Sequence, residues 1–203
     1  MDRRDLLKLS LAAGAGLAVH TAQAQQPACA TDGTPAQFTP KRPPDASPAE
    51  NDIGKQPKCP YCGMDRKQFG HTRMLVHYSD DLSDGTCSLH CAAISLAVNV
   101  DREPKAIYVG DNAATAETKP LVEVGKATFL IGSGIKGVMT KRSKMAYGTA
   151  DVARAAQAAH GGELAGFDQA LLAAYADMAA DVAMIRKNRE ERRKRMMDQQ
   201  HKG

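Results

Sequence analysis

The chain has 203 residues, a formal net charge of +4 at pH 7 and five cysteines. It has no tryptophan and only 4% aromatic residues, so a site that stacks sugar rings or nucleobases is not expected. The length allows one domain or two very small ones. The sequence has no serine–histidine–aspartate set, paired acidic motif or phosphate-binding loop that would indicate a hydrolase or a nucleotide-binding enzyme.

The first 24 residues have the three parts of an export signal. A charged start with Arg3 and Arg4 precedes an apolar run at residues 9–19, and residues 22–24 form a small-x-small cleavage site. The apolar run is too short to span a bilayer as a stable helix. The paired arginines resemble a twin-arginine signal, with an ordinary secretory signal as the alternative. We therefore predict a periplasmic protein that is cleaved near Ala24.

Residues 25–57 are predicted to form a flexible linker. The stretch is rich in proline, alanine, glutamine and threonine. Proline prevents regular structure because it lacks a backbone N–H, and a chain of this composition acts as a tether. The folded domain is placed after it at residues 58–185, in two halves of about 58–112 and 119–185.

The first half is predicted to contain a strand, a helix and a second strand. Residues 74–78 have the composition of a strand, and a polar turn is expected at residues 80–85. A helix capped by Thr86 or Ser88 should follow, and residues 106–109 should form the next strand. The helix is predicted from apolar residues at helical spacing, namely Leu89, Ala92, Ala93, Leu96 and Ala97.

The second half begins with two predicted strands, at residues 121–124 and 127–131. Gly125 and Lys126 lie between them and are interpreted as a hairpin turn. Residues 144–147 are expected to extend a sheet.

A helix at residues 152–159 should then end at two glycines, and a short strand at residues 163–167 should lead to a long last helix capped by Asp168. The order of elements favours an α+β protein with two small units followed by a helix. The last helix has a predicted apolar stripe of Leu171, Leu172, Tyr175, Met178, Ala179, Val182 and Ile185.

Residues 186–203 are predicted to be a basic helical tail. Eight lysines and arginines minus three acidic residues give this segment a local charge of +5, so the rest of the chain is close to neutral. A solvated helix end is the usual explanation of such a run. Contact with a partner or peripheral contact with an anionic membrane surface is the functional alternative, and nucleic acid is not expected as a partner of an exported protein.

Four of the five cysteines fall into two clusters. Cys59 and Cys62 flank two residues of a loop, whereas Cys87 and Cys91 are four residues apart on the predicted helix, with His90 between them. Residues three or four apart are neighbours on a helix face, and Cys87 is expected in the first turn, where free backbone N–H groups favour a thiolate. The two pairs can therefore enclose one metal ion.

The residues around the cysteines indicate which metal is preferred. Four thiolates alone would suit structural zinc. Met64 follows directly after the first pair, however, and thioethers are soft donors that prefer Cu(I). The candidate metal ligands are Cys59, Cys62, Met64, Cys87, His90, Cys91 and Met139, with Met145 and His77 as secondary candidates.

Three other uses of the cysteines stay open from the residues alone. Two disulfides or a structural zinc ion could stabilise a small exported interaction module, because thiols outside the cytoplasm tend to be oxidised unless a metal holds them. A thiol oxidoreductase is the third alternative. It is disfavoured because the Cys59–Cys62 pair follows proline-rich chain rather than a strand of a parallel sheet.

These motifs resemble the NosL family, which comprises exported copper chaperones linked to nitrous oxide reductase assembly and hence to denitrification. The resemblance spans about residues 58–180. It rests on Cys-Pro-Tyr-Cys-Gly-Met at residues 59–64, the later cysteine-containing helix, Gly-Val-Met at residues 137–139 and the run at residues 160–168.

Membership would imply that the two small units are ββαβ-like and that the protein is a metal carrier and not an enzyme. The long C-terminal helix that follows these units is predicted from its own apolar stripe, and its charged extension departs from the family pattern. Membership would also imply one Cu(I) site of cysteine and methionine, with histidine as an optional ligand. The expected partner is nitrous oxide reductase or its maturation complex. On this basis Cys59, Cys62 and Met64 correspond to the family's cysteine motif, and Met139 corresponds to the methionine of its second half.

Overall fold

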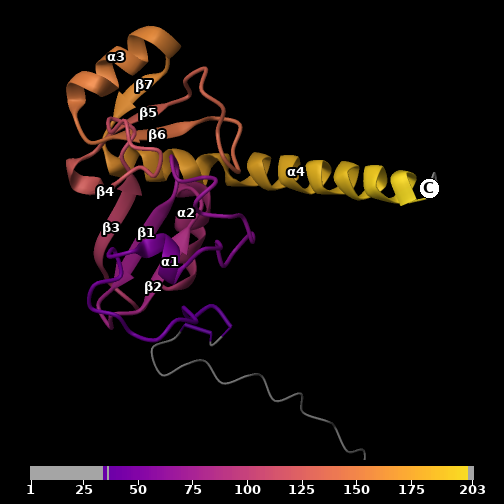
Figure 1. Cartoon of the computed structure of the whole chain (residues 1–203), viewed down its shortest axis with the longest axis horizontal. Coiled ribbons are helices and arrows are strands. Elements are labelled where there is room, and N and C mark those ends of the chain that lie inside the picture. The colour runs from indigo at the N-terminus through magenta and orange to yellow at the C-terminus, as the bar shows by residue number, and fades with distance from the viewer. Residues whose placement is uncertain (1–33, 36, 201–203) are drawn as a thin grey trace, which may run out of the picture.

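Two small antiparallel sheets and a long last helix form the protein (Figure 1). The computed structural model describes residues 34–35 and 37–200, so the predicted signal peptide lies outside the described residues. The predicted α+β fold with two ββαβ units is confirmed. The first unit contains β1 (Met74–Tyr78), β2 (Ser83–Thr86), α2 (Leu89–Val98) and β3 (Pro104–Gly110); the second contains β5 (Thr128–Ile131), β6 (Lys144–Tyr147), α3 (Ala150–His160) and β7 (Glu163–Ala165).

The two sheets repeat one arrangement. The first strand of each unit is flanked by the second and third, which gives the orders β2-β1-β3 and β6-β5-β7. A further strand, β4 (Leu121–Glu123), extends the first sheet by pairing with β3. All of these pairings are antiparallel. The order strand, strand, helix, strand therefore occurs twice along the chain, once in each unit.

The predicted hairpin over residues 121–131 is wrong, because its two strands belong to different sheets. β4 pairs with the first unit and β5 with the second, and η1 (Val124–Lys126), a short 3-10 helix, connects them. The physical reason is burial. Val124 and Ala127 are 8% and 9% exposed, so the connection packs into the core instead of turning at the surface.

The predicted polar turn at residues 80–85 is also only partly correct, since residues 83–86 form the buried strand β2. Its polar groups are satisfied by partners distant in sequence. The backbone N–H of Gly85 donates to the side chain of Gln56, and the Ser83 hydroxyl accepts from the Gln56 amide at 2.8 Å. A strand with hydrogen-bonded polar residues can be buried without an apolar pattern.

The last helix, α4 (Phe167–Gln200), joins the two units. It packs against α2 of the first unit and β5 of the second, and Figure 1 shows it crossing their junction. Ala170 and Ala174 are buried in its contact face, and Leu171 and Met178 of the predicted stripe pack against the core beside them. Leu172 of the stripe is instead 69% exposed, so the stripe is only partly correct.

Beyond Ile185, α4 continues as a solvent-exposed helix. Residues 186–200 are all exposed, and Figure 1 shows this part extending away from both sheets. At 1.5 Å per residue the whole helix is about 51 Å long and the exposed part about 22 Å. Within the described residues, no helix combines the length and apolarity needed to cross a membrane.

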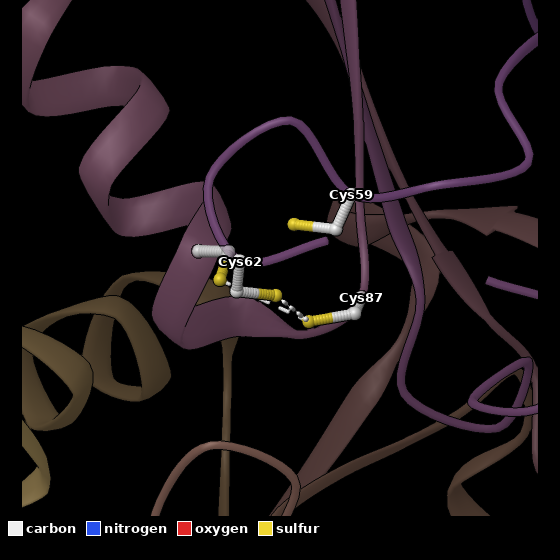
Figure 2. Close-up of side chains that lie close together, drawn as sticks. Cys59, Cys62 and Cys87 are labelled. Carbon is white, nitrogen blue, oxygen red and sulfur yellow. Dashed lines mark hydrogen bonds between the residues drawn. The ribbon is translucent and has the colours of Figure 1, made fainter. Parts of the chain in front are cut away.

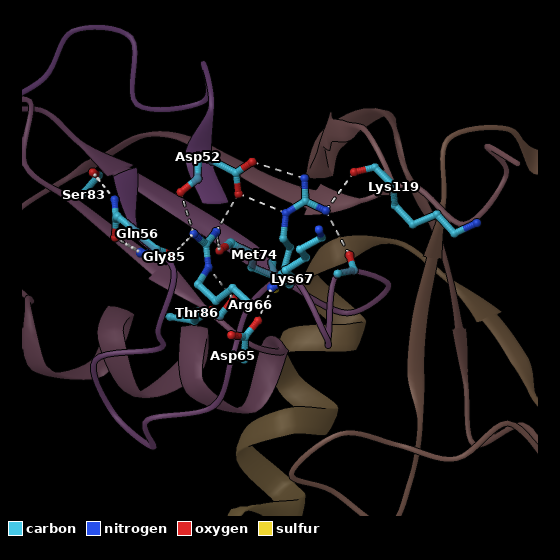
Figure 3. A network of polar contacts seen from close by, with 12 residues as sticks. Asp52, Gln56, Asp65, Arg66, Lys67, Met74, Ser83, Gly85, Thr86 and Lys119 are labelled. Atoms are coloured by element: carbon cyan, nitrogen blue, oxygen red, sulfur yellow. Dashed lines mark hydrogen bonds and ion pairs between the residues drawn. The ribbon is translucent and has the colours of Figure 1, made fainter. Parts of the chain in front are cut away.

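The segment predicted as a flexible linker is partly folded. It contains α1 (Asp52–Lys55), and Asp52 is buried against two arginines (Figure 3). The Asp52 carboxylate lies 2.7 Å from Nη2 of Arg66 and 3.0 Å from Nε of Arg73. The fully buried Arg66 also donates to the backbone carbonyls of Gln56, Thr86 and Met74. These charge-assisted hydrogen bonds fix residues 52–57 to the first unit.

Candidate metal centre

The structure brings the four clustered cysteines together. Their Sγ atoms all lie within 4.8 Å of one another, and all four are free thiols. The Sγ atoms of Cys62 and Cys87 are 3.4 Å apart (Figure 2). Those of Cys87 and Cys91 are 3.8 Å apart. A tetrahedral site with 2.3 Å metal–sulfur bonds needs sulfurs about 3.8 Å apart. The cluster therefore fits one thiophilic ion.

The Cys59–Cys62 pair is held by a closed loop. The backbone N–H of Cys59 donates to the Met64 carbonyl, and the N–H of Gly63 donates to the Cys59 carbonyl, each at 2.9 Å. The loop closes because Gly63 has a φ of 77°, in the left-handed region that glycine adopts without steric cost. Cys59 is buried, whereas Cys62 is half-buried.

The second pair is positioned by the junction of β2 and α2. Cys87 follows β2 directly and lies before the helix instead of in its first turn, because Ser88 is extended, with φ and ψ of −166° and 170°. Cys91 lies in the first turn of α2, near free backbone N–H groups that favour negative charge. The Thr72 hydroxyl donates to the Cys87 carbonyl at 2.8 Å and fixes this junction.

Two methionines pack against the sulfur cluster. Met64 comes from the first unit and Met139 from the loop between β5 and β6, where Val138 also contacts the cysteines. Met139 has a φ of 62°, an unusual conformation that costs a residue with a side chain about 1–2 kcal/mol. Both units therefore contribute soft sulfur donors to the same place.

The two secondary candidates lie elsewhere. Met145 on β6 packs in a separate apolar cluster with Leu130 and Tyr147. His77 on β1 places its Nε2 3.0 Å from Oδ1 of Asp81. The structure does not bring either side chain into the sulfur cluster, so a ligand role for them stays a prediction.

His90 is adjacent to the cluster in sequence but is directed at the last helix. Its Nδ1 lies 3.5 Å from Oδ2 of Asp181, and both side chains are buried. Burial lowers the pKa of His90, so the imidazole is neutral at pH 7. The other Asp181 oxygen accepts from the backbone N–H of Lys141 at 3.1 Å. The polar Asp181 in an apolar helix stretch was the available signal for this contact.

Hydrogen bonds within the sulfur cluster shift the thiol pKa values in opposite directions, downward at Cys59 and Cys62 and upward at Cys87 and Cys91. The pKa of Cys59 is lowered far below its usual value, chiefly by hydrogen bonds from Cys62, Cys87 and Cys91. The pKa values of Cys87 and Cys91 are raised, first by their hydrogen bonds to Cys59 and also by burial. An incoming metal ion would meet a thiolate at Cys59 and displace protons from the other thiols.

The sequence analysis missed two contacts to the Cys59–Cys62 loop. Tyr61 donates from its hydroxyl to the buried carboxylate of Asp84 at 2.6 Å. Arg189, in the basic part of α4, donates from Nη2 to the Cys62 carbonyl at 3.5 Å. No local motif predicts either contact, because the partners are far apart in sequence.

The fold and the sulfur cluster together define a thiol-rich metal-binding protein. The family model for NosL matches residues 50–173, more than half of the chain. The chain therefore belongs to the NosL family, a family of copper chaperones and not of enzymes.

Comparison with solved structures gives a weaker likeness. The crystal structure of the copper chaperone NosL from Shewanella denitrificans is 23% identical, with a TM-score of 0.46. The likeness covers 55% of this chain and 87% of that chain. A comparison with curated proteins gives no match.

Proposed function

We propose that the protein is a periplasmic Cu(I) chaperone that delivers copper to nitrous oxide reductase or its maturation machinery. The observation that carries the proposal is the convergence of four cysteine sulfurs within 4.8 Å, with Met64 and Met139 packed beside them. Family membership supports copper as the metal. The predicted export signal and the family resemblance support the location and the client.

The donor set favours Cu(I) over zinc. Thiolates and thioethers are the soft ligands that select Cu(I), whereas a closed set of four thiolates alone would also suit zinc. The proposed ligands are the four clustered cysteines together with the two methionines. Met139 is the informative residue, because it comes from the second unit and keeps a strained backbone conformation beside the thiols.

Unequal burial of the ligands supports a role in transfer. Cys59, Cys87 and Cys91 are buried, whereas Cys62 is half-buried at one side of the cluster. A partner's ligands would approach from the Cys62 side and bind the ion before the buried thiols release it. Stepwise ligand exchange of this kind keeps the ion coordinated by sulfur throughout.

A titration of the reduced protein with Cu(I) under a competing chelator tests copper binding. The wild-type protein should bind tightly, and the double variant Cys59→Ser/Cys62→Ser should lose that binding. Cys29→Ser is the matched control, because Cys29 is the fifth cysteine and lies outside both clusters. Binding only in the millimolar range, or binding that survives the double substitution, would refute the proposal.

Delivery needs a separate test. Copper-loaded protein is mixed with copper-free nitrous oxide reductase, and copper transfer is measured after the two proteins are separated. Transfer faster than from a small-molecule copper complex supports this client. Tight Cu(I) binding without transfer would support Cu(I) binding but refute nitrous oxide reductase as the recipient of the copper. Stoichiometric zinc or two disulfides in protein purified without reductant would instead favour a stabilised interaction module.

The basic part of α4 is proposed to contact anionic membrane surfaces peripherally. Between residues 186 and 200, seven lysines and arginines minus three acidic residues leave a charge of +4 on an exposed helix. Each basic residue near an anionic bilayer contributes about 1 kcal/mol of attraction. The helix has no continuous apolar face, so the contact would be electrostatic and would not involve insertion.

A further inference from the structure

We propose that Asp84 is a positioning residue that aligns the four thiols by accepting hydrogen bonds from the segments that carry them. The inference rests on the proposed function, because it explains how the metal site is held ready in the metal-free protein. It concerns two hydroxyl contacts, from Tyr61 and Ser95, which meet on one carboxylate oxygen of Asp84.

The geometry at Asp84 is compact. Its Oδ2 accepts a hydrogen bond from the Tyr61 hydroxyl at 2.6 Å and another from the Ser95 hydroxyl at 2.7 Å. Because the Ser95 proton is used in this contact, Ser95 accepts the proton of the Tyr78 hydroxyl, 2.6 Å away. Asp84 is 4% exposed and Ser95 is fully buried. Water therefore does not compete freely for these hydrogen bonds.

Each of the three residues belongs to a segment that bears a thiol. Tyr61 lies between Cys59 and Cys62 in the closed loop. Asp84 lies on β2, which leads directly to Cys87. Ser95 lies on α2 one turn after Cys91, at the i+4 position that shares its helix face. One carboxylate oxygen thus connects all the segments that supply the four sulfurs.

Tyr78 provides an internal comparison. Its hydroxyl belongs to the same buried chain of hydrogen bonds, but Tyr78 lies on β1, which carries no cysteine. Removing either tyrosine hydroxyl deletes one hydrogen bond from the chain. Only the loss at Tyr61 removes a hydrogen bond to the Asp84 carboxylate itself, because the Tyr78 hydroxyl donates to Ser95.

The expected consequence is a loss of preorganisation. A metal site requires its ligands to be held within about 0.5 Å of the binding geometry by the residues around them. Loss of such an outer contact typically lowers metal affinity 10- to 100-fold. Without the Tyr61 hydroxyl, the half-buried Cys62 would sample positions away from Cys87, which its Sγ now contacts at 3.4 Å.

The test compares Tyr61→Phe with Tyr78→Phe in the full chain. Tyr61→Phe should lower Cu(I) affinity at least about 10-fold under a competing chelator and alter the copper–thiolate absorption spectrum. It should also speed alkylation of Cys62 in the metal-free protein. Each substitution deletes one hydrogen bond, so the two variants should have similarly lowered melting temperatures. Tyr78→Phe should nevertheless keep the Cu(I) affinity, the absorption spectrum and the Cys62 alkylation rate of the wild-type protein.

Two results would overturn the proposal. One is wild-type affinity and alkylation in Tyr61→Phe, and the other is an equal loss in both variants. If Tyr61→Phe does not fold, Ser95→Ala tests the same carboxylate from the α2 side by the same measurements. The alkylation assay uses no copper, so it decides the positioning role independently of the proposed function. Absence of Cu(I) binding by the wild-type protein would refute only the proposed function.

Discussion

The imidazole of His90 and the carboxylate of Asp181 face each other across the junction of α2 and α4, with Nδ1 and Oδ2 3.5 Å apart. Asp181 also accepts from the backbone N–H of Lys141, in the loop that carries Met139. One buried carboxylate on the last helix therefore contacts both the helix that bears Cys91 and the loop that supplies the second thioether.

Asp181→Ala should lower the free energy of unfolding by about 1–3 kcal/mol, because it removes the acceptor of the Lys141 backbone N–H and the carboxylate that faces the buried His90 ring. Urea denaturation measures the loss. Asp198→Ala is the matched control on the exposed part of the same helix and should change stability by less than about 0.5 kcal/mol. Equal effects of the two substitutions would show that the Asp181 contacts are energetically unimportant.

Met139→Leu should weaken Cu(I) binding about 10-fold, because leucine keeps the apolar bulk and removes the thioether sulfur. Met145→Leu is the control, since Met145 lies in a separate apolar cluster. Its affinity should equal that of the wild-type protein. Chelator competition measures both variants, and the same affinity in the two would exclude Met139 from the copper site.

Cu(I) affinity should rise with pH. The raised pKa values of Cys87 and Cys91 keep these thiols protonated in the free protein, so copper binding through them releases protons. The pKa values of Cys59 and Cys62 are lowered, so these two sulfurs contribute less to the slope. The logarithm of the affinity should rise by about two per pH unit between about pH 6 and 8.

Chelator titrations at several pH values, corrected for protonation of the chelator, give this slope. The double variant Cys87→Ser/Cys91→Ser should lose most of it. A pH-independent affinity in the wild-type protein would mean that copper is bound without the second thiol pair.

Asp52→Asn should destabilise the fold by about 3–5 kcal/mol, because it removes the charge that compensates the buried arginines Arg66 and Arg73. Chemical denaturation measures the change. Glu123→Gln removes an acidic residue from the exposed ion pair with Lys126 and should cost less than about 1 kcal/mol. A small loss in Asp52→Asn would show that residues 52–57 are not an integral part of the domain.

The basic part of α4 should bind vesicles of anionic phospholipid at low salt and release them at high salt. The triple variant Arg192→Gln/Arg193→Gln/Arg195→Gln should lose about 1 kcal/mol of binding free energy per removed charge. Co-sedimentation with the vesicles measures binding.

A control variant, Lys105→Gln/Lys126→Gln/Arg154→Gln, changes the net charge equally at sites on β3, η1 and α3. It should keep vesicle binding. Equal losses in the two triple variants would mean that net charge and not the helix drives binding, and absence of binding by the wild-type protein would reject membrane contact.

Local patterns were sufficient to predict the two α+β units, the last helix and the cysteine pairs. Spacing alone indicated that residues 59 and 62 could converge, and the apolar periodicity of residues 89–97 placed Cys91 on a helix. The exact start of that helix was misplaced, because the extended Ser88 leaves Cys87 outside it. Helix ends depend on caps, which the pattern of apolar residues does not determine.

The errors have a common physical cause: residues distant in sequence supply the hydrogen bonds and the packing contacts of a segment. β2 is polar in sequence but buried, because Gln56 and Tyr61 supply its hydrogen bonds. The stripe of α4 left out Ala170 and Ala174, which are buried, and included Leu172, which is exposed. Such choices depend on tertiary geometry, and a single sequence contains no local signal for them.

The exposed continuation of α4 changes how the protein behaves in solution. A compact chain of this length has a radius of gyration of about 17 Å. The exposed part of the helix is about 22 Å long, so it is longer than that radius. Its projecting rod increases frictional drag without adding mass. A monomer will therefore elute early from a gel-filtration column and resemble a larger particle, and multi-angle light scattering is the measurement that returns its true molar mass.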